Sequence, residues 1–92
     1  MNYYALFYDL VPDYLSRRGM LREAHLRLAK EAQARGELLL AGVFDNPVDR
    51  ALLVFRVKDI SAIEEFVAKD PYVLNKLVTR WEIRPWTVVI GN

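Results

Sequence analysis

Residues 37–57 read ELLLAGVFDNPVDRALLVFRV, and this stretch decides the fold. Two apolar runs, residues 37–44 and 51–57, flank the segment DNPVDR, which is rich in residues that favour turns. Apolar runs of this length on either side of a turn are typical of antiparallel strands joined as a hairpin. The stretch therefore predicts a β-hairpin at the centre of the chain.

The sequence on either side of the hairpin predicts a strand and a helix before it, and a helix and a strand after it. Residues 3–8, YYALFY, favour a strand. Apolar residues at helical spacing follow, from a cap at Ser16 to a left-handed stop at Gly36. After the hairpin we expect a helix that begins at Asp59 or Ser61 and breaks near Asp70, a short helical turn over residues 71–78, and a last strand over residues 81–90.

The order strand, helix, strand, strand, helix, strand is that of a ferredoxin-like α+β fold. We expect a four-stranded antiparallel sheet with two helices on one face, in a single domain over residues 1–92. The second and last strands would form the sheet edges. Pro85 fits an edge because proline has no backbone N–H for the ladder.

The other face of this sheet would be open in a single chain. Residues 38–40, 52–55 and 88–90 are continuous apolar runs, a pattern typical of strands buried on both faces. The simplest cover is a second copy of the chain, sheet against sheet, in a dimeric α+β barrel that buries about 1,200–2,000 Å². We expect this pairing to enclose a cavity. The alternative is that the chain's own loops cover the open face.

Composition excludes several classes of function. The 92 residues carry 13 Lys+Arg and 12 Asp+Glu, with one His and no Cys, so we expect no disulfide, no metal site and no cofactor. A net charge of +1 argues against nucleic acid, and the strand at 51–57 lacks the Gly-aromatic pattern of RNA-recognition modules. No apolar run approaches the roughly 20 residues that span a bilayer. We expect a soluble, cytoplasmic protein.

His25 is the only side chain of a type that exchanges protons near neutral pH. Helical spacing places it on an apolar stripe with Leu21 and Leu28, so it should be at least partly buried. One interpretation is a core histidine bonded to a backbone carbonyl. The other is a general base, which requires a carboxylate to fix its tautomer.

Asp70 is the candidate carboxylate. It lies 45 residues beyond His25, so only the fold can bring the two together. Asp followed by Pro71 is also a common helix start, and a capping role is compatible with a catalytic one. Arg18 and Arg22 place positive charge near the start of the first helix, which indicates either a bound anion or a solvated face.

Three short motifs resemble the YCII-related (YciI-like) family, and together they span most of the chain in the expected order. They are Arg18-x-x-x-Arg22-x-Ala24-His25-Leu26, Gly36-x-Leu38-x-x-Ala41-Gly42, and Asp70-Pro71-Tyr72.

The resemblance implies a ferredoxin-like subunit that dimerises through its sheet, with a pocket where His25 and Asp70 meet as a catalytic dyad. It also implies that Arg18, Arg22 and Tyr72 bind a small substrate. The kind of reaction it suggests is proton transfer, such as elimination of chloride from a ring compound.

Two hypotheses of function follow. The first is a small homodimeric enzyme in which His25 takes a proton from a small, anionic organic substrate and Asp70 orients the imidazole. Elimination, isomerisation or hydrolysis would fit this chemistry, and a lyase of the dehydrochlorinase kind is one form of it. The second is a non-catalytic dimeric module that binds a small molecule or has a structural role.

Overall fold

The computed structural model describes residues 1–91. In chain order its elements are β1 (Asn2–Leu10), α1 (Tyr14–Arg17), α2 (Gly19–Ala34), β2 (Leu38–Val43), β3 (Arg50–Val57), α3 (Ser61–Lys69), α4 (Pro71–Leu74) and β4 (Val78–Trp86).

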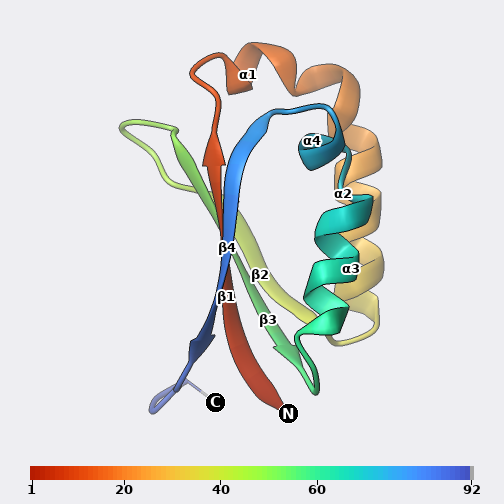
Figure 1. Cartoon of the computed structure of the whole chain (residues 1–92), viewed down its shortest axis with the longest axis vertical. Coiled ribbons are helices and arrows are strands. Elements are labelled where there is room, and N and C mark those ends of the chain that lie inside the picture. Colours follow the sequence, from red (N-terminus) through yellow and green to blue (C-terminus); the bar gives the residue numbers. More distant parts are fainter. Residues whose placement is uncertain (92) are drawn as a thin grey trace.

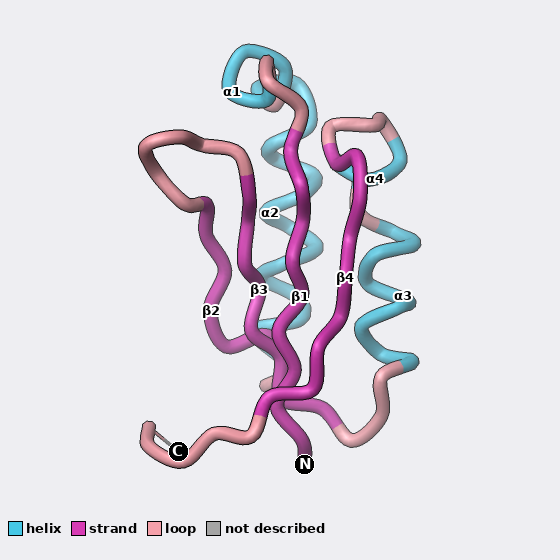
Figure 2. The backbone as a smooth tube through the Cα atoms, turned by 60° about the vertical axis from the view of Figure 1, so that its left-hand side comes forward, coloured by secondary structure: helices cyan, strands magenta, loops and turns pink. Residues whose placement is uncertain are grey.

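The four strands form one antiparallel sheet in the order β2-β3-β1-β4. The two long helices, α2 and α3, lie side by side on one face of it, and the other face carries no helix (Figures 1 and 2). The sheet therefore has β2 and β4 at its edges, and the predicted ferredoxin-like fold is confirmed.

Side chains of the two central strands point alternately to the two faces of the sheet, and those on the helix side build the core. Leu6 of β1 is paired with Leu53 of β3, and both are fully or almost fully buried. On the helix side, Ile63 and Phe66 of α3 pack into the same cluster, and the Phe66 ring meets Phe55 edge to face at 5.3 Å. Burial of these apolar side chains is the main force that holds the helices on the sheet.

The last strand begins and ends earlier than its sequence predicts. Pro85 lies on the edge strand β4, opposite Tyr4, as its missing donor requires. The ladder ends at Trp86, which is paired with Tyr3 near the start of β1. Beyond that point only Asn2 of β1 remains, so residues 88–90 have no strand residue opposite them, and the prediction that they form a strand is wrong.

The first predicted helix is divided in two. Ser16 does not cap it, because this residue lies inside α1, where its Oγ donates to the Asp13 carbonyl. Arg18 separates α1 from α2, which begins at Gly19. The predicted stop is confirmed: Gly36 follows α2 with φ of 79°, in the left-handed region.

The break at Asp70 is confirmed and has a clear cause. Pro71 disfavours a helical conformation in the residue before it, and Asp70 is extended, with φ −71° and ψ 118°. The short helix after it is shorter than expected, ending at Leu74, since Val78 already belongs to β4. The bend turns the Asp70 side chain into the molecule.

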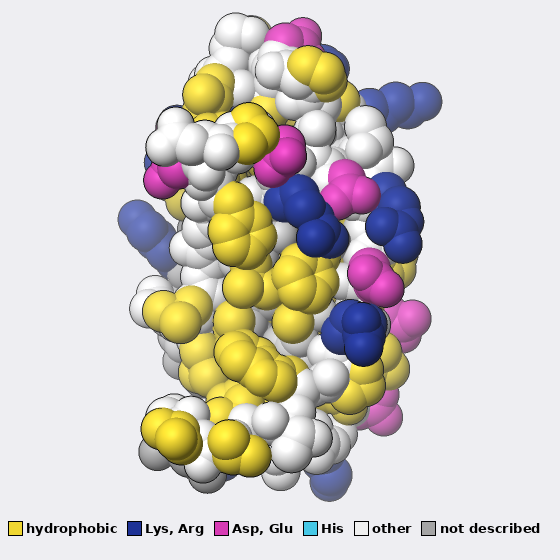
Figure 3. All heavy atoms as spheres, turned by 90° about the vertical axis from the view of Figure 1, so that its left-hand side faces the viewer, with side chains coloured by type: hydrophobic (Ala, Val, Ile, Leu, Met, Phe, Trp, Pro, Cys, Tyr) yellow, Lys and Arg dark blue, Asp and Glu magenta, His cyan; other side chains and the backbone are white. Residues whose placement is uncertain are grey.

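The helix-free face of the sheet is largely apolar in the single chain. Figure 3 shows hydrophobic side chains gathered along this face, with charged side chains mainly at one side of it. Leu40 is 71% exposed there, and Phe44 and Trp86 are also exposed. The chain's own loops therefore leave this face uncovered within residues 1–91.

Candidate active site

His25 lies on the inner side of α2, as its spacing predicts. Its side chain is 13% exposed, so the imidazole is mostly buried but still reaches open space. Leu21 and Leu28 on the same stripe are partly buried against the core.

Asp70 lies at the centre of a hydrogen-bond network and is 0% exposed. Its Oδ1 lies 2.8 Å from His25 Nδ1 and accepts the backbone N–H of Tyr72 at 3.0 Å. Its Oδ2 accepts the hydroxyl of Tyr8 at 2.8 Å. The carboxyl group therefore caps α4 and contacts the imidazole at the same time. The capping role predicted for Asp70 is thus compatible with its contact to His25.

This network determines the tautomer of the neutral imidazole. If Asp70 is ionised, its oxygens can only accept hydrogen bonds, and the neutral imidazole then carries its proton on Nδ1, facing Asp70 Oδ1. The lone pair is then on Nε2, at the far side of the ring from the carboxylate. A nitrogen with a free lone pair, on a ring held by a carboxylate, is the arrangement that a general base needs.

Tyr8 is a member of this network that motif analysis missed. Burial raises the pKa of its hydroxyl well above the usual value, and the charge of Asp70 and the hydrogen bond to it act in the same direction. The signal in the sequence is weak: the alternation of β1 turns Tyr8 inward, and a buried tyrosine hydroxyl usually finds a partner. Which partner it finds is decided by the fold.

Tyr72 forms a second wall beside the histidine. Its ring is stacked on the imidazole, with centroids 3.9 Å apart and planes 11° from parallel. It also meets the Tyr14 ring edge to face at 5.6 Å, and the Arg18 guanidinium lies over that Tyr14 ring at 5.5 Å. The split between α1 and α2 thus brings Tyr14 and Arg18 to the histidine.

A cavity of about 180 Å³ opens beside these rings, between α2 and the inner face of the sheet. Its sheet residues belong to the core on the helix side, so pairing through the opposite face of the sheet, as expected from the sequence, would not enclose this cavity. Ala41 and Gly42 of the edge strand are exposed at its side. The lining residues are Tyr8, Leu10, Tyr14, Arg18, Arg22, His25, Leu26, Ala29, Ala41, Gly42, Val43, Ala51, Leu53 and Tyr72.

The fold brings together the five residues that the sequence singles out. His25, Arg18, Arg22 and Tyr72 line the cavity, and Asp70 lies behind the imidazole, out of contact with solvent. Their roles in catalysis and binding stay predictions.

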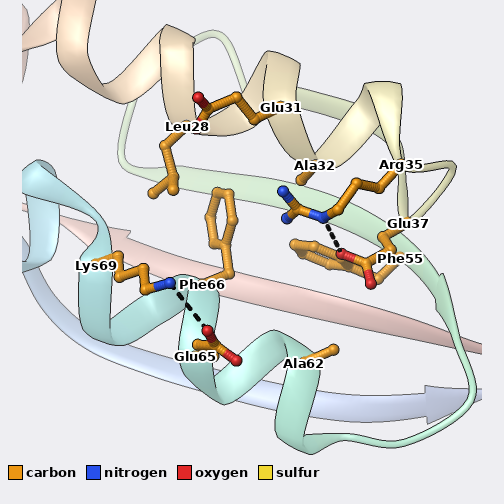
Figure 4. A pocket seen from close by; sticks show the side chains of 10 residues that line it. All are labelled: Leu28, Glu31, Ala32, Arg35, Glu37, Phe55, Ala62, Glu65, Phe66 and Lys69. Atoms are coloured by element: carbon orange, nitrogen blue, oxygen red, sulfur yellow. Dashed lines mark hydrogen bonds and ion pairs between the residues drawn. The ribbon is translucent and has the colours of Figure 1, made fainter.

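A second cavity, of about 380 Å³, lies near the other end of the two long helices (Figure 4). Four of its five charged side chains pair with one another, Arg35 with Glu37 at 3.0 Å and Lys69 with Glu65 at 2.9 Å. Although it is larger, it contains neither a histidine nor a buried charged group. We therefore place the candidate active site in the smaller cavity.

The sheet order, the two covering helices and the histidine-lined cavity define a ferredoxin-like α+β protein. The chain belongs to the YCII-related family, because the sequence model of the YCII-related domain matches residues 1–87. The resemblance seen in its three motifs is thereby confirmed.

One relative and two solved structures show the range of similar proteins. An uncharacterized protein of Haemophilus influenzae is 31% identical over 80 residues, which cover 77% of this chain and 82% of that protein. The 5-chloro-2-hydroxyhydroquinone dehydrochlorinase of Burkholderia phenoliruptrix, solved with 2,5-dihydroxybenzoquinone, has a TM-score of 0.77 at 17% identity, covering 92% of this chain and 93% of its own. A dimeric ferredoxin-like protein from an uncultured marine organism has a TM-score of 0.51 at 17% identity, covering 98% and 89%. At these identities the two structures show the shared fold.

Two further observations concern the expected partners. None of the helices within residues 1–91 is long and apolar enough to cross a membrane. In the same residues, no three His, Cys, Asp or Glu side chains come together as a group that could hold a metal ion.

Proposed function

We propose that this protein is a small homodimeric enzyme in which His25 removes a proton from a small organic substrate. The observation that carries the proposal is the hydrogen bond of 2.8 Å between His25 Nδ1 and the fully buried Asp70. It directs the lone pair of Nε2 away from the carboxylate, and the ring itself lines a cavity. As Nε2 takes the proton, the electron pair of the broken bond stays on the substrate, and Asp70 stabilises the imidazolium that forms.

The size and the lining of the cavity favour a small, anionic substrate. Its volume of about 180 Å³ is well below the roughly 300–1,000 Å³ of sites for drug-sized ligands. The side chains of Arg18 and Arg22 at its wall provide positive charge, and the Tyr72 ring provides a flat surface. We assign these three residues to substrate binding. The chemistry needs no cofactor, and we expect it to take place in the cytoplasm.

The dehydrochlorinase with the same fold suggests the first reaction to test. In an elimination of this kind, a base removes a proton, and the electron pair of the broken bond then expels chloride. The products are an unsaturated ring and chloride ion. We therefore expect chloride release from 5-chloro-2-hydroxyhydroquinone, measured as chloride ion. Replacing a positioned general base typically lowers the rate by about 10²–10⁴-fold.

The variants for this assay are His25→Ala and Asp70→Asn, with Lys58→Ala as a control at an exposed position. We expect both site variants to lose turnover and the control to keep it. Full turnover in both site variants would rule out a catalytic role for His25 and Asp70. If the unmodified protein releases no chloride, a panel of enolisable keto acids in D₂O tests proton abstraction directly. No exchange of any C–H would favour the alternative, a non-catalytic dimeric module that binds a small molecule or has a structural role.

We propose the homodimer because one face of the sheet is open in the single chain. A typical specific interface buries about 800 Å² per partner, roughly an eighth of the 6121 Å² surface of this chain. The apolar side chains on the helix-free face, Leu40 among them, offer a surface of the kind that a second copy covers (Figure 3). A charged residue there should separate the two copies.

The test compares Leu40→Glu with Met20→Glu by light scattering at micromolar concentration. Met20 is 97% exposed on α2, so its variant adds the same charge away from the sheet. We expect the unmodified protein and Met20→Glu to be dimers and Leu40→Glu to be a monomer. A monomeric unmodified protein would contradict the proposal.

A further inference from the structure

Tyr8 is a buried side chain of the candidate active site to which the proposed reaction gives no role. It is 1% exposed and lies on β1, one of the two central strands of the sheet. Its hydroxyl donates to Oδ2 of Asp70 at 2.8 Å, and Oδ1 of the same carboxyl group lies 2.8 Å from Nδ1 of His25. The carboxyl group therefore connects the tyrosine hydroxyl to the proposed base.

Three groups from separate elements hold this carboxyl group in its orientation. Oδ2 accepts the hydroxyl of Tyr8 on β1, while Oδ1 faces His25 on α2 and accepts the backbone N–H of Tyr72 on α4. Burial disfavours the charged form of a carboxyl group, and hydrogen bonds to that form offset the cost. The Tyr8 hydroxyl therefore has two effects on Asp70: it fixes the direction of Oδ1, and it stabilises the charge.

The Tyr8 hydroxyl acts on Asp70 as a donor and keeps its own proton. Burial raises the pKa of this hydroxyl well above its usual value, and the charge of Asp70 and the hydrogen bond to it act in the same direction. The hydroxyl therefore stays protonated over the whole range in which a histidine exchanges protons. Any effect of this hydroxyl on the imidazole passes through Asp70.

We propose that Tyr8 is a positioning residue: its hydrogen bond to Oδ2 keeps Oδ1 of Asp70 on the imidazole and sets the pH above which His25 is a free base. This deepens the proposed function and rests on it. A general base works only while it is unprotonated, so the acid limit of the reaction is set in part by a residue that never meets the transferred proton.

The direction of the effect follows from the charge of the pair. His25 and Asp70 together carry one negative charge while the imidazole is neutral and none once it is protonated. In the protonated pair the imidazolium already balances the carboxylate, so a donor to Oδ2 stabilises the negative pair more than the neutral one. The Tyr8 hydroxyl therefore lowers the pH at which the imidazole takes up its proton, and its removal should raise that pH.

The other charged or titratable side chains that line the cavity are unchanged by a substitution at position 8. Among the described residues they are Tyr14 of α1, Arg18 at the break between α1 and α2, Arg22 of α2 and Tyr72 of α4. A change in the titration of His25 on loss of the Tyr8 hydroxyl can thus be assigned to the bond with Asp70.

The test is an NMR titration of the imidazole, which needs neither substrate nor turnover. His25 is the only histidine among the 92 residues, so its signals are identified directly. We expect Tyr8→Phe to raise the midpoint of the titration by about 0.5 to 2 pH units, because a hydrogen bond to a charged group is lost. Tyr4→Phe is the matched control, since Tyr4 lies on the same strand and packs against the same core, and it should leave the midpoint in place.

Two further variants should move the midpoint the other way, to lower pH. Asp70→Asn removes the charge that favours the imidazolium. Tyr8→3-fluorotyrosine keeps the ring in place and makes its hydroxyl a stronger donor. Where turnover is measured, the acid limb of kcat should move with the midpoint in Tyr8→Phe.

A midpoint that Tyr8→Phe leaves unmoved or lowers, or that Tyr4→Phe raises as much, would overturn the inference and leave Tyr8 with a structural role only. This outcome is separate from that of the proposed function. If the midpoint responds to Tyr8 and the protein neither releases chloride nor exchanges any C–H, the link from Tyr8 to His25 stands and the proposed reaction is wrong. If turnover depends on His25 while the titration ignores Tyr8, only the positioning role is wrong.

Discussion

Removing the hydroxyl of Tyr8 should cost more stability than removing the hydroxyl of Tyr72. The Tyr8 hydroxyl bonds to Oδ2 of Asp70, a carboxylate with no exposed surface. Tyr8→Phe deprives this oxygen of its partner, and hydrogen bonds to charged groups are worth about 1.5–3 kcal/mol. The Tyr72 hydroxyl makes no hydrogen bond of standard geometry in residues 1–91, and the side chain next to it is the neutral Tyr14, so Tyr72→Phe should cost less, at most about 1 kcal/mol.

The assay is urea unfolding of the two variants and the unmodified protein. With a slope of about 1–3 kcal/mol per molar urea for a chain of this size, Tyr8→Phe should lower the midpoint by roughly 1 M and Tyr72→Phe should lower it clearly less. All three proteins must be compared at one concentration, because the stability of a dimer depends on it. Equal losses in both variants would refute the reasoning, since the two hydroxyls would then be equally well bonded in the folded protein.

Three further predictions concern stability. Burial raises the pKa of Tyr8 and of Tyr72, so above about pH 10 the unfolded chain binds fewer protons than the folded chain. The free energy of unfolding should therefore be at its full value below about pH 10 and fall toward about pH 12. A urea midpoint that stays flat over that range would contradict the pKa shifts of Tyr8 and Tyr72. Asp70→Ala removes the cap of α4 and the partner of three donors, so it should cost at least about 2 kcal/mol. Asp59→Ala, whose exposed carboxylate accepts one backbone N–H, should cost clearly less, and equal costs on urea unfolding would count against the network. Gly36→Ala should cost about 1–2 kcal/mol from backbone conformation alone, because no atom obstructs a Cβ there, and an unchanged melting temperature would argue against the left-handed stop.

Local sequence predicted those features that local chemistry decides. Gly36 ends its helix because its φ is positive, and Pro71 bends the chain because it restricts Asp70. Helical spacing placed His25 on the inner face, and the hairpin at residues 37–57 led to the correct strand order. The resemblance to the family added the pairing of His25 with Asp70.

Features that depend on contacts between distant segments could not be predicted in the same way. The end of β4 at Trp86 depends on where β1 begins, not on the apolar residues that follow. Tyr8 joins the Asp70 network across 62 residues, and no motif marks it. Tyr14 and Arg18 line the cavity from α1 and from the break between α1 and α2, a division that a continuous helical pattern conceals.

The central claim is that Asp70 holds His25 with a free lone pair on Nε2. The most direct measurement is the ¹⁵N NMR spectrum of the imidazole in the neutral state, in the unmodified protein and in Asp70→Asn. We expect Nδ1 to carry the proton in the unmodified protein and this preference to weaken in the variant. A neutral ring with its proton on Nε2, unaffected by the loss of the carboxylate, would contradict it.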